Sequence, residues 1–237
     1  MKRTSSELKG LAREALLGNY TVPVAAFFMT QLAIMAITFT YTNLFGIATS
    51  TFGLIIFYIG YLIIVLLSGL VGAGYSRLLM NLSRNYPYQF SDLIYPFSHQ
   101  GDRILLTTLL KALMELLCLL PALAAFLLLM LSTGRVWLKL VTLILFLVGM
   151  VGCFAIELTY ALTTYICLDT PELTTTEVMQ CSREMMQGNR LRLLYVEISF
   201  IGLMLLSVLS LNIGFLWLYP YMETTKIQFY RDLSGEI

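Results

Sequence analysis

The sequence predicts an all-α fold: a polytopic membrane helix bundle of six membrane helices arranged as three hairpins, with amphipathic interfacial helices on the cytoplasmic side. The first reason is composition, because 58% of the 237 residues are hydrophobic and 12% are charged, against about 45–50% and about 25% in soluble domains. The second reason is that no charged residue occurs between positions 15 and 76, a length that allows two crossings of about 20 apolar residues each. We therefore expect residues 1–237 to form a single integral membrane domain.

A short phrase that occurs twice is the third reason. The phrase AREALLGN occupies positions 12–19, and SREMMQGN occupies positions 182–189, which is 170 positions later. Each copy comes just before a long apolar run. This internal repeat predicts two elbows, in each of which a basic amphipathic helix lies on the membrane surface before the chain turns into the bilayer.

The first expected element is an interfacial helix over residues 1–19. Thr4 and Glu7 have the spacing of a capping box, in which each side chain satisfies a free backbone N–H of the other residue. Gly18 suits the left-handed position that ends a helix, and Arg13 lies on the polar face, near the lipid headgroups. The apolar run that follows is too long for a signal peptide, so we expect a retained cytoplasmic helix.

The first membrane hairpin is expected over residues 21–44 and 52–75. Gly69 and Ala73 are one turn apart in its second arm, and small residues at this spacing let two helix backbones approach closely. The polar and aromatic segment that follows is expected to contain a short interfacial helix over residues 90–97.

The second hairpin is expected over residues 104–131 and 140–168, with a turn at 133–135. Pro121 predicts a kink in its first arm, which neighbouring helices can accommodate.

The third hairpin is preceded by the second interfacial helix, expected over residues 174–188. Thr174 and Glu177 repeat the capping box of the first copy. The two arms of the hairpin are then expected over residues 193–211 and 215–232.

The distribution of lysine and arginine predicts the topology, because short loops rich in these residues stay in the cytoplasm. If the N-terminus is cytoplasmic, the loop cations also fall in the cytoplasm except Arg135 and Lys139. This predicts a multi-pass protein of the cytoplasmic membrane with both termini inside. Because residues 215–232 contain Glu223 and Lys226, a chain with five crossings remains the alternative.

Several stretches of the chain match a family pattern. They cover residues 168–173, 182–188, 199–202, 217–221 and 229–233 in the second half, and residues 8–20 and 90–93 in the first half. In these stretches the chain resembles the bacterial integral membrane family known as domain of unknown function 975. The resemblance implies a multi-helix inner-membrane protein of bacteria and assigns no reaction.

Ionisable residues inside the predicted spans are the strongest candidates for a functional site, since burying a charge in a bilayer is costly. Glu115 and Glu157 each lie 12 residues from the cytoplasmic end of a helix, which is roughly 18 Å along a straight helix and near the middle of a core about 30 Å thick. Lys111 is one turn from Glu115, and Tyr160 extends the polar face of the other helix. These residues predict either a proton- or cation-responsive polar site or a structural arrangement, with a Lys111–Glu115 ion pair and a protonated Glu157.

A second group of candidates could contact lipid headgroups. It consists of four arginines near the repeated phrases: Arg13, Arg183, Arg190 and Arg192. A basic residue near anionic lipid contributes about 1 kcal/mol. The alternative is that these arginines do no more than set the topology.

No arrangement typical of an enzyme is found. The single histidine, His99, lies near Asp102, but no nucleophile motif or phosphate-binding loop accompanies it. The four cysteines have no metal-ligand spacing, and a net charge of +1 does not indicate a nucleic-acid groove. We therefore expect no catalytic residue, no cofactor, no metal and no nucleic acid.

The sequence favours a non-enzymatic membrane protein that acts as an accessory or partner-binding component. Its expected partners are the lipid bilayer and another membrane protein or a second copy of the chain. The alternative is a small transporter or permease with a Glu/Lys site in the middle of the membrane, formed by Lys111, Glu115 and Glu157.

Overall fold

The computed structural model describes residues 3–46, 50–99, 101–131 and 136–237. All regular structure in these ranges is helical. The elements in chain order are α1 (Ser5–Leu16), α2 (Thr21–Phe45), α3 (Thr51–Ser83), the 3₁₀ helix η1 (Phe90–Leu93), α4 (Tyr95–His99), α5 (Gly101–Leu131), α6 (Val136–Thr159), α7 (Thr163–Asp169), α8 (Thr175–Met186), α9 (Arg190–Ile198), α10 (Ile201–Leu209) and α11 (Phe215–Ser234).

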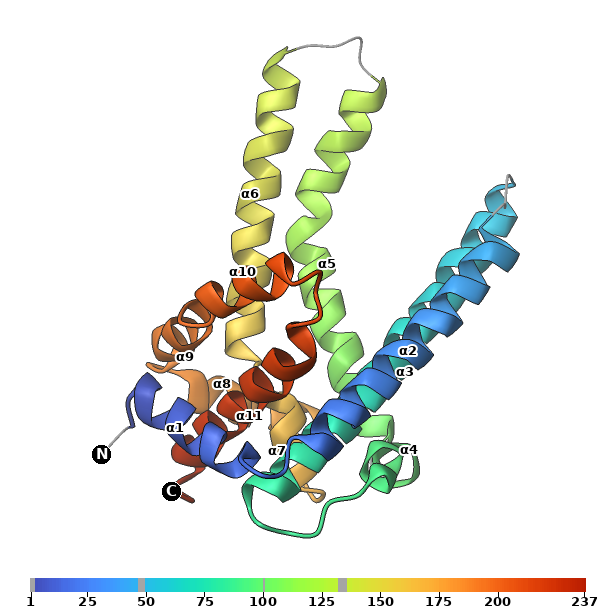
Figure 1. The fold of residues 1–237 in the computed structure, drawn as a ribbon. Helices are drawn as coiled ribbons and strands as arrows, with labels where there is room; N and C mark the ends of the chain where they lie inside the picture. The colour runs from blue at the N-terminus through green and yellow to red at the C-terminus, as the bar shows by residue number, and fades with distance from the viewer. Residues whose placement is uncertain (1–2, 47–49, 100, 132–135) are drawn as a thin grey trace.

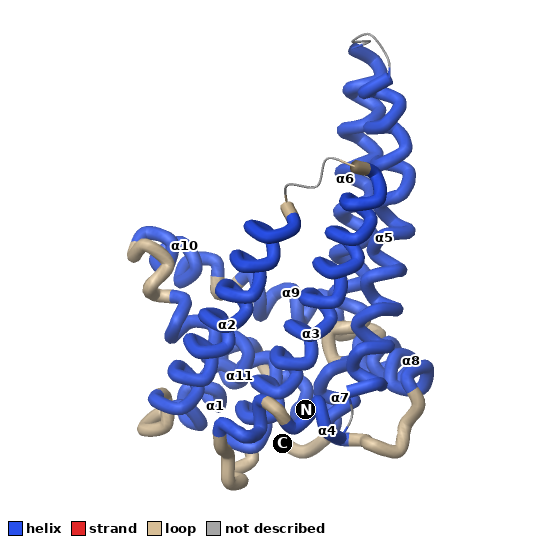
Figure 2. The backbone as a smooth tube through the Cα atoms, turned by 90° about the vertical axis from the view of Figure 1, so that its right-hand side faces the viewer, coloured by secondary structure: helices blue, strands red, loops and turns tan. Residues whose placement is uncertain are grey.

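Two long hairpins rise from a packed base that also holds both chain termini (Figure 1). One hairpin is α2 with α3, and the other is α5 with α6. The hairpins meet where a Cβ on Gly69 would lie 3.5 Å from Thr108, and they diverge beyond that point (Figures 1 and 2). The predicted approach of helices at Gly69 is thus present, but only near the base.

Five helical segments of the described chain are long and apolar enough to cross a membrane. They are Thr21–Phe45, Thr51–Ser83, Gly101–Leu131, Val136–Asp169 and Arg190–Leu209. The last predicted membrane helix forms α11 but is not among these five, because Glu223, Lys226, Arg231 and Asp232 interrupt its apolar character. The α10–α11 turn also lies well below the tips of the two long hairpins (Figure 1).

The helix α3 continues two turns past its expected end at residue 75 and finishes at Ser83. Its extension packs against η1, where a Cβ on Gly74 would collide with the Leu93 carbonyl oxygen. Arg77 lies over the Tyr95 ring, 3.3 Å from its centre, and forms a 3.6 Å ion pair with Asp92. The short helices η1 and α4 occupy the segment predicted to hold one interfacial helix at residues 90–97.

The spans expected at residues 140–168 and 193–211 are each broken. The first divides at residues 160–162 into α6 and α7, and the second divides at Ser199 and Phe200 into α9 and α10. At both breaks hydroxyl groups bond to nearby carbonyls: Thr163 Oγ1 donates to Tyr160 O (2.8 Å) and Ser199 Oγ donates to Val196 O (2.5 Å). Such side-chain bonds compete with the helical pattern. The turn expected at residues 133–135 lies outside the described residues.

The two copies of the repeated phrase have the same local geometry. Both helices begin with a complete capping box, Thr4 with Glu7 and Thr174 with Glu177. In each copy a glycine in the left-handed conformation follows the helix, with φ of +81° at Gly18 and +76° at Gly188. The buried residues also correspond in position: Leu8, Ala12 and Leu16 in α1, and Val178, Ser182 and Met186 in α8.

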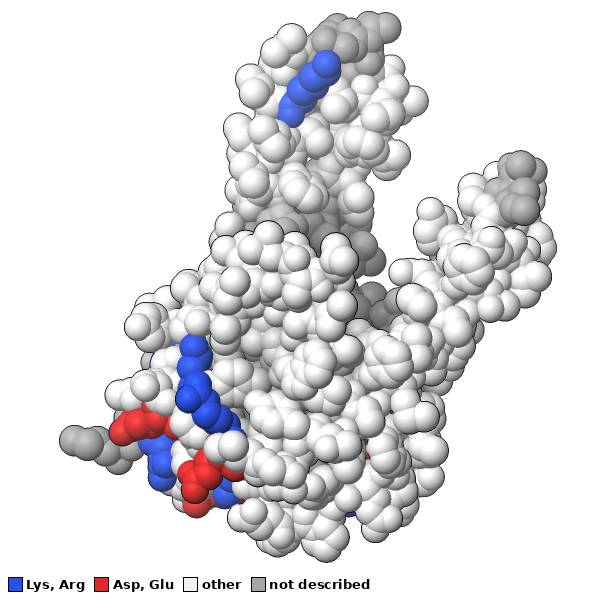
Figure 3. Space-filling view, viewed as in Figure 1, with Lys and Arg blue, Asp and Glu red and all other residues white. Residues whose placement is uncertain are grey.

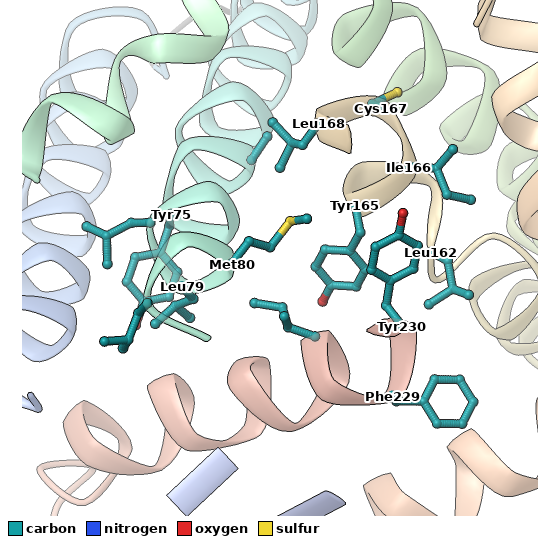
Figure 4. Packing of buried hydrophobic residues seen from close by; sticks show 14 of the residues in the cluster. Tyr75, Leu79, Met80, Leu162, Tyr165, Ile166, Cys167, Leu168, Phe229 and Tyr230 are labelled. Carbon is teal, nitrogen blue, oxygen red and sulfur yellow. The ribbon is translucent and has the colours of Figure 1, made fainter. Parts of the chain in front are cut away.

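The apolar core lies in the base, where α3, α7 and α11 meet (Figure 4). Tyr75 and Leu79 come from α3, Ile166 comes from α7 and Phe229 comes from α11, and all four are buried. On the face drawn in Figure 3, charged side chains gather low on the molecule and almost none lie on the two hairpins. Apolar hairpins above a charged base are the arrangement expected when the hairpins lie in lipid.

Candidate functional site

A polar cavity of about 340 Å³ lies between the helices. It is lined by residues of α3, α5, α6, α7, α9 and α11 and of the break between α6 and α7. Its charged and hydroxyl-bearing side chains are Ser76, Lys111, Glu157, Tyr160, Thr163, Thr164, Tyr165, Glu197, Tyr219, Glu223 and Lys226. We call this space the inner cavity.

The first ion pair of the inner cavity joins two of the residues predicted from the sequence. Lys111 Nζ on α5 lies 2.7 Å from Glu157 Oε2 on α6. The lysine thus reaches across to the neighbouring helix, and its ion pair within 4.0 Å is with Glu157 instead of the Lys111–Glu115 pair considered from the sequence. The Glu157 side chain remains 55% exposed, so a solute in the cavity can reach it.

Glu115 lies beside this pair but does not line the inner cavity. Its Oε1 is buried and makes no hydrogen bond to the described residues. The depth predicted for Glu157 assumed a straight helix from residue 169. Because the helix is broken at residues 160–162, the predicted depth of Glu157 no longer follows. The depth predicted for Glu115 keeps its basis, since α5 is continuous from Gly101 to Glu115.

The second ion pair was not foreseen from the sequence. Lys226 Nζ on α11 lies 3.0 Å from Glu197 Oε1 on α9. From the sequence, Lys226 was considered only as an obstacle to crossing, and Glu197 was not predicted as a site residue. The signal that could have identified them is their position on apolar segments, where charged residues are rarely found without a partner.

Glu223 on α11 is the carboxylate of the inner cavity without an ion pair within 4.0 Å in the described chain, although it interacts electrostatically with Lys226, three residues along the same helix. Its Oε1 accepts a hydrogen bond from Ser76 Oγ (2.8 Å) on α3 and another from Tyr165 OH (2.9 Å) on α7. Among the described residues no lysine or arginine forms an ion pair with it within 4.0 Å. Two neutral hydroxyls therefore hold one oxygen of the carboxylate, and the other oxygen makes no protein hydrogen bond within the described chain.

The inner cavity has an excess of negative charge. Glu157, Glu197 and Glu223 oppose Lys111 and Lys226, which leaves a net charge of −1 when all five are ionised. A carboxylate with hydroxyl donors and an unshared oxygen can bind a small cation or a proton.

Tyr160 lies in the break between α6 and α7 and lines two cavities. One is the inner cavity, and the other is a larger space of about 880 Å³ against α8 and the start of α9. The larger space is lined by Arg183 and Arg190, two of the arginines predicted to contact lipid.

The other two predicted lipid contacts lie elsewhere. Arg13 is exposed on α1. Arg192 is engaged within the protein: it forms an ion pair with Asp232 and donates to the backbone oxygen of Arg3. Its position over the Phe229 ring, 5.0 Å from the centre, adds to this internal role.

Side chains that could serve catalysis or metal binding are dispersed. His99 stacks on Tyr95 at 4.1 Å between ring centres, away from the inner cavity. Within the described residues no group of three or more His, Cys, Asp or Glu side chains could hold a metal ion.

The chain was compared with protein families, curated proteins and solved structures. A family model described as "Protein of unknown function (DUF975)" matches residues 1–236. No curated protein and no solved structure has significant similarity to the chain. Because the match covers nearly the whole chain, the protein belongs to the DUF975 family.

Proposed function

We propose that the protein is a small transporter or permease that binds a small cation at Glu223 in the inner cavity and performs no enzymatic reaction. The observation that carries this proposal is the arrangement of Glu223, with two hydroxyl donors, no ion-pair partner among the described residues and a polar cavity around it. A carboxylate among membrane helices is costly and is usually retained for a function. A bound cation would add a direct opposite charge to that of Lys226, which pairs with Glu197 and acts on Glu223 only from beyond 4.0 Å.

The broken helices support the same role. Transporters often form their binding sites where membrane helices are discontinuous, because unwound backbone can then face the solute. Tyr160 belongs to such a break and Thr163 begins the helix after it, and both line the inner cavity.

The proposed topology places both termini in the cytoplasm. Both termini lie in the base of the molecule (Figure 1), which agrees with an even number of crossings. The helices α2, α3, α5 and α6 would cross the bacterial inner membrane, and α1 and α8 would lie on its cytoplasmic surface as amphipathic helices. The repeated phrase would then mark two equivalent elbows.

The third hairpin, α10 with α11, needs a modified topology. The apolar part of α11 covers residues 215–222, which is about 12 Å of helix against a core about 30 Å thick. We propose that this hairpin enters the membrane and returns without reaching the other side. The chain would keep six membrane helices in three hairpins, but only four of these helices would cross completely.

Labelling with a membrane-impermeant maleimide tests this topology. Val136→Cys should label on intact cells from the outside, and Ser234→Cys should label only after the membrane is opened. Asn212→Cys, at the α10–α11 turn, should stay unlabelled from outside. Outside labelling of Asn212→Cys would show a complete crossing instead.

Transport is tested with purified protein in proteoliposomes. The probes are protons, rubidium ions and methylammonium, and the wild-type protein should carry at least one of them above the rate of empty liposomes. Glu223→Gln should lose this flux, because it removes the negative charge. The matched control Glu172→Gln, at an exposed position, should keep it. No flux of any of the three probes would contradict the proposal.

Glu115→Gln and Glu157→Gln separate a functional role from a structural one. Normal abundance with lost flux would place these carboxylates on the transport path. Lost abundance of Glu157→Gln would instead indicate that its pair with Lys111 serves folding.

An accessory role remains the second candidate, because the two long hairpins diverge (Figures 1 and 3). The space between them could be occupied by another membrane protein or a second copy of the chain. Leu123 on α5 is 47% exposed and lies far along the hairpin. If a second copy binds there, Leu123→Cys should form a disulfide-linked dimer in membranes under mild oxidation.

A further inference from the structure

The larger cavity, of about 880 Å³, lies at the second elbow. Its wall consists of α8, the turn at Gly188 and the first residues of α9. We infer that this elbow cavity binds the phosphate head group of a membrane lipid, an activity separate from the cation site in the inner cavity.

The charge of the elbow cavity suits a phosphate. Arg183 and Arg190 line it, and among the described residues neither forms an ion pair within 4.0 Å of an acidic group. The cavity also holds Glu184, whose Oε1 accepts a hydrogen bond from Gln180 (2.8 Å). Two arginines against one glutamate leave a net charge of +1.

The neighbouring Arg192, in contrast, is held in an ion pair within the protein. It is paired with Asp232, and its side chain is 19% exposed. Arg183 and Arg190 have no such partner, so their guanidinium groups remain available to bind phosphate oxygens. The start of α9, which carries a partial positive charge, lies at the same cavity.

The first elbow provides an internal comparison. It has the same capping box and the same left-handed glycine, but Tyr20 stands where the second elbow has Arg190. The cavity beside Tyr20, of about 470 Å³, is lined by Val24, Phe28 and Trp217 among others and by no charged residue. This cavity is formed by Tyr20, α2 and α11 and includes no residue of α1. The two elbows differ at the position that carries Arg190 in one and the uncharged Tyr20 in the other.

An apolar stripe beside the elbow cavity indicates a lipid instead of a soluble phosphate compound. Leu191, Tyr195 and Ile198 recur at helical spacing on α9 and are 78%, 66% and 50% exposed. Leu191 also lines the cavity. A lipid with its phosphate between Arg183 and Arg190 could lay an acyl chain along this stripe, whereas a soluble phosphate would leave it uncovered.

The test measures the melting temperature of the purified full chain in detergent at increasing ligand concentration. The two probes are a short-chain phosphatidylglycerol and glycerol phosphate. The lipid should raise the melting temperature of the wild-type protein. Arg183→Gln and Arg190→Gln should each weaken its binding about fivefold, and the double variant roughly 25-fold. Because both side chains are exposed and have no ion-pair partner in the described chain, the variants should fold normally without ligand.

Matched variants define the outcomes. Arg13→Gln, the equivalent change in the first elbow, should bind the lipid like wild type, and Leu191→Gln should weaken the lipid but not glycerol phosphate. Equal binding of glycerol phosphate and lipid, both lost in the double variant, would support a phosphate site with a soluble ligand. The inference is overturned if neither probe raises the melting temperature, or if the double arginine variant binds as wild type does.

Discussion

The two elbows of this chain have nearly the same backbone, yet the hairpins that follow them differ. The first elbow leads into α2 and α3, which have 25 and 33 residues and no charged residue before Arg77. The second leads into α9 and α10, of nine residues each, and then into α11, of 20 residues. These helices bring Glu197, Glu223 and Lys226 to the inner cavity.

This difference shows that separate features of the sequence specify the turn at the elbow and the depth that the following hairpin can reach. A capping box and a left-handed glycine act within a few residues, so they produce the same turn wherever they occur. The length and polarity of the next apolar run decide how deep the hairpin can go. The same elbow thus begins, in one half of the chain, a hairpin with two arms long and apolar enough to cross a membrane and, in the other half, a hairpin in which only the first arm, Arg190–Leu209, is long and apolar enough.

We call α1 to α3 the first unit and α8 to α11 the second unit, since each consists of an elbow and the helices that follow it. The largest expected effect comes from an ion pair that the second unit has and the first lacks. Arg192 stands where the first unit has Val22, and it pairs with Asp232, whose side chain is 3% exposed. Asp232→Asn should lower the free energy of unfolding by about 3 kcal/mol, because it leaves a mostly buried guanidinium without its counter-charge. Unfolding in a detergent titration measures this.

The exposed Asp102→Asn serves as its control and should change stability by less than about 0.5 kcal/mol. If Asp232→Asn changes the free energy of unfolding as little as the control does, the Arg192–Asp232 pair does not stabilise the second unit. The proposed difference between the two units would then be contradicted for this ion pair.

The next effect concerns the contacts of Glu223 in the second unit with α3 of the first unit and with α7, which belongs to neither unit. Ser76 comes from α3 and Tyr165 from α7, and both donate to the same carboxylate oxygen. Ser76→Ala and Tyr165→Phe should each lower the free energy of unfolding by about 1.5 kcal/mol, because a hydrogen bond to a charged group is lost. Tyr86→Phe, at a position 59% exposed, should have no effect.

A double-mutant cycle sharpens this result. In a Glu223→Gln background the two substitutions should cost less than in wild type, since the partners act on one group. Additive effects would mean that the hydroxyls stabilise the fold independently of Glu223.

The elements that depend on local sequence were predicted well. The helix expected at residues 21–44 is observed at Thr21–Phe45, and both predicted capping boxes are confirmed. Capping and apolar periodicity act over a few residues, so a single sequence reveals them. The family was also identified from short stretches, and the match over residues 1–236 confirms it.

The candidate site was predicted only in part, because its members come from distant segments. Lys111 and Glu157 were predicted as site residues, but their ion pair was not. The two residues are 46 positions apart in the sequence, and they meet only because α5 packs on α6. Ser76 and Glu223 are 147 residues apart, and no local pattern relates them. At residues 160–162 hydroxyl groups compete with the backbone hydrogen bonds of the helix. A hydropathy pattern does not predict such a break, because it does not include these hydrogen bonds.

The third prediction tests whether the two elbows are equivalent in energy. Gly18→Ala and Gly188→Ala should each lower the free energy of unfolding by about 1 kcal/mol, because alanine is strained at positive φ. A Cβ at either position would meet no atom within 4 Å, so strain in the backbone is the sole expected cost. Gly10→Ala is the control: it lies inside α1 with open space around it, and it should stabilise the protein by about 0.5–1 kcal/mol. Unequal costs at the two elbows, measured by thermal unfolding, would show that their surroundings matter.

The smallest effect is a pH dependence that both elbows should share. The backbone N–H of Thr174 and, to a lesser degree, its hydroxyl donate to Glu177 and lower the pKa of this carboxyl below its ordinary value. Thr4 lowers the pKa of Glu7 in the same way. A carboxyl whose pKa is lower in the folded state stabilises the fold above its unfolded pKa, and this contribution is lost as the pH falls through the folded pKa.

Acidification from neutral pH to below the ordinary glutamate range, which is centred at about 4.3, should therefore weaken both capping boxes. Glu7→Gln and Glu177→Gln should each remove the part of the stability that depends on this titration, because glutamine can keep the capping bond but carries no proton to titrate. Since both carboxyls are fully exposed, salt should reduce the effect. Stability measured against pH for wild type and the two variants checks this. If only one variant flattens the curve, the two capping boxes contribute differently, and the equivalence of the elbows is limited to their geometry.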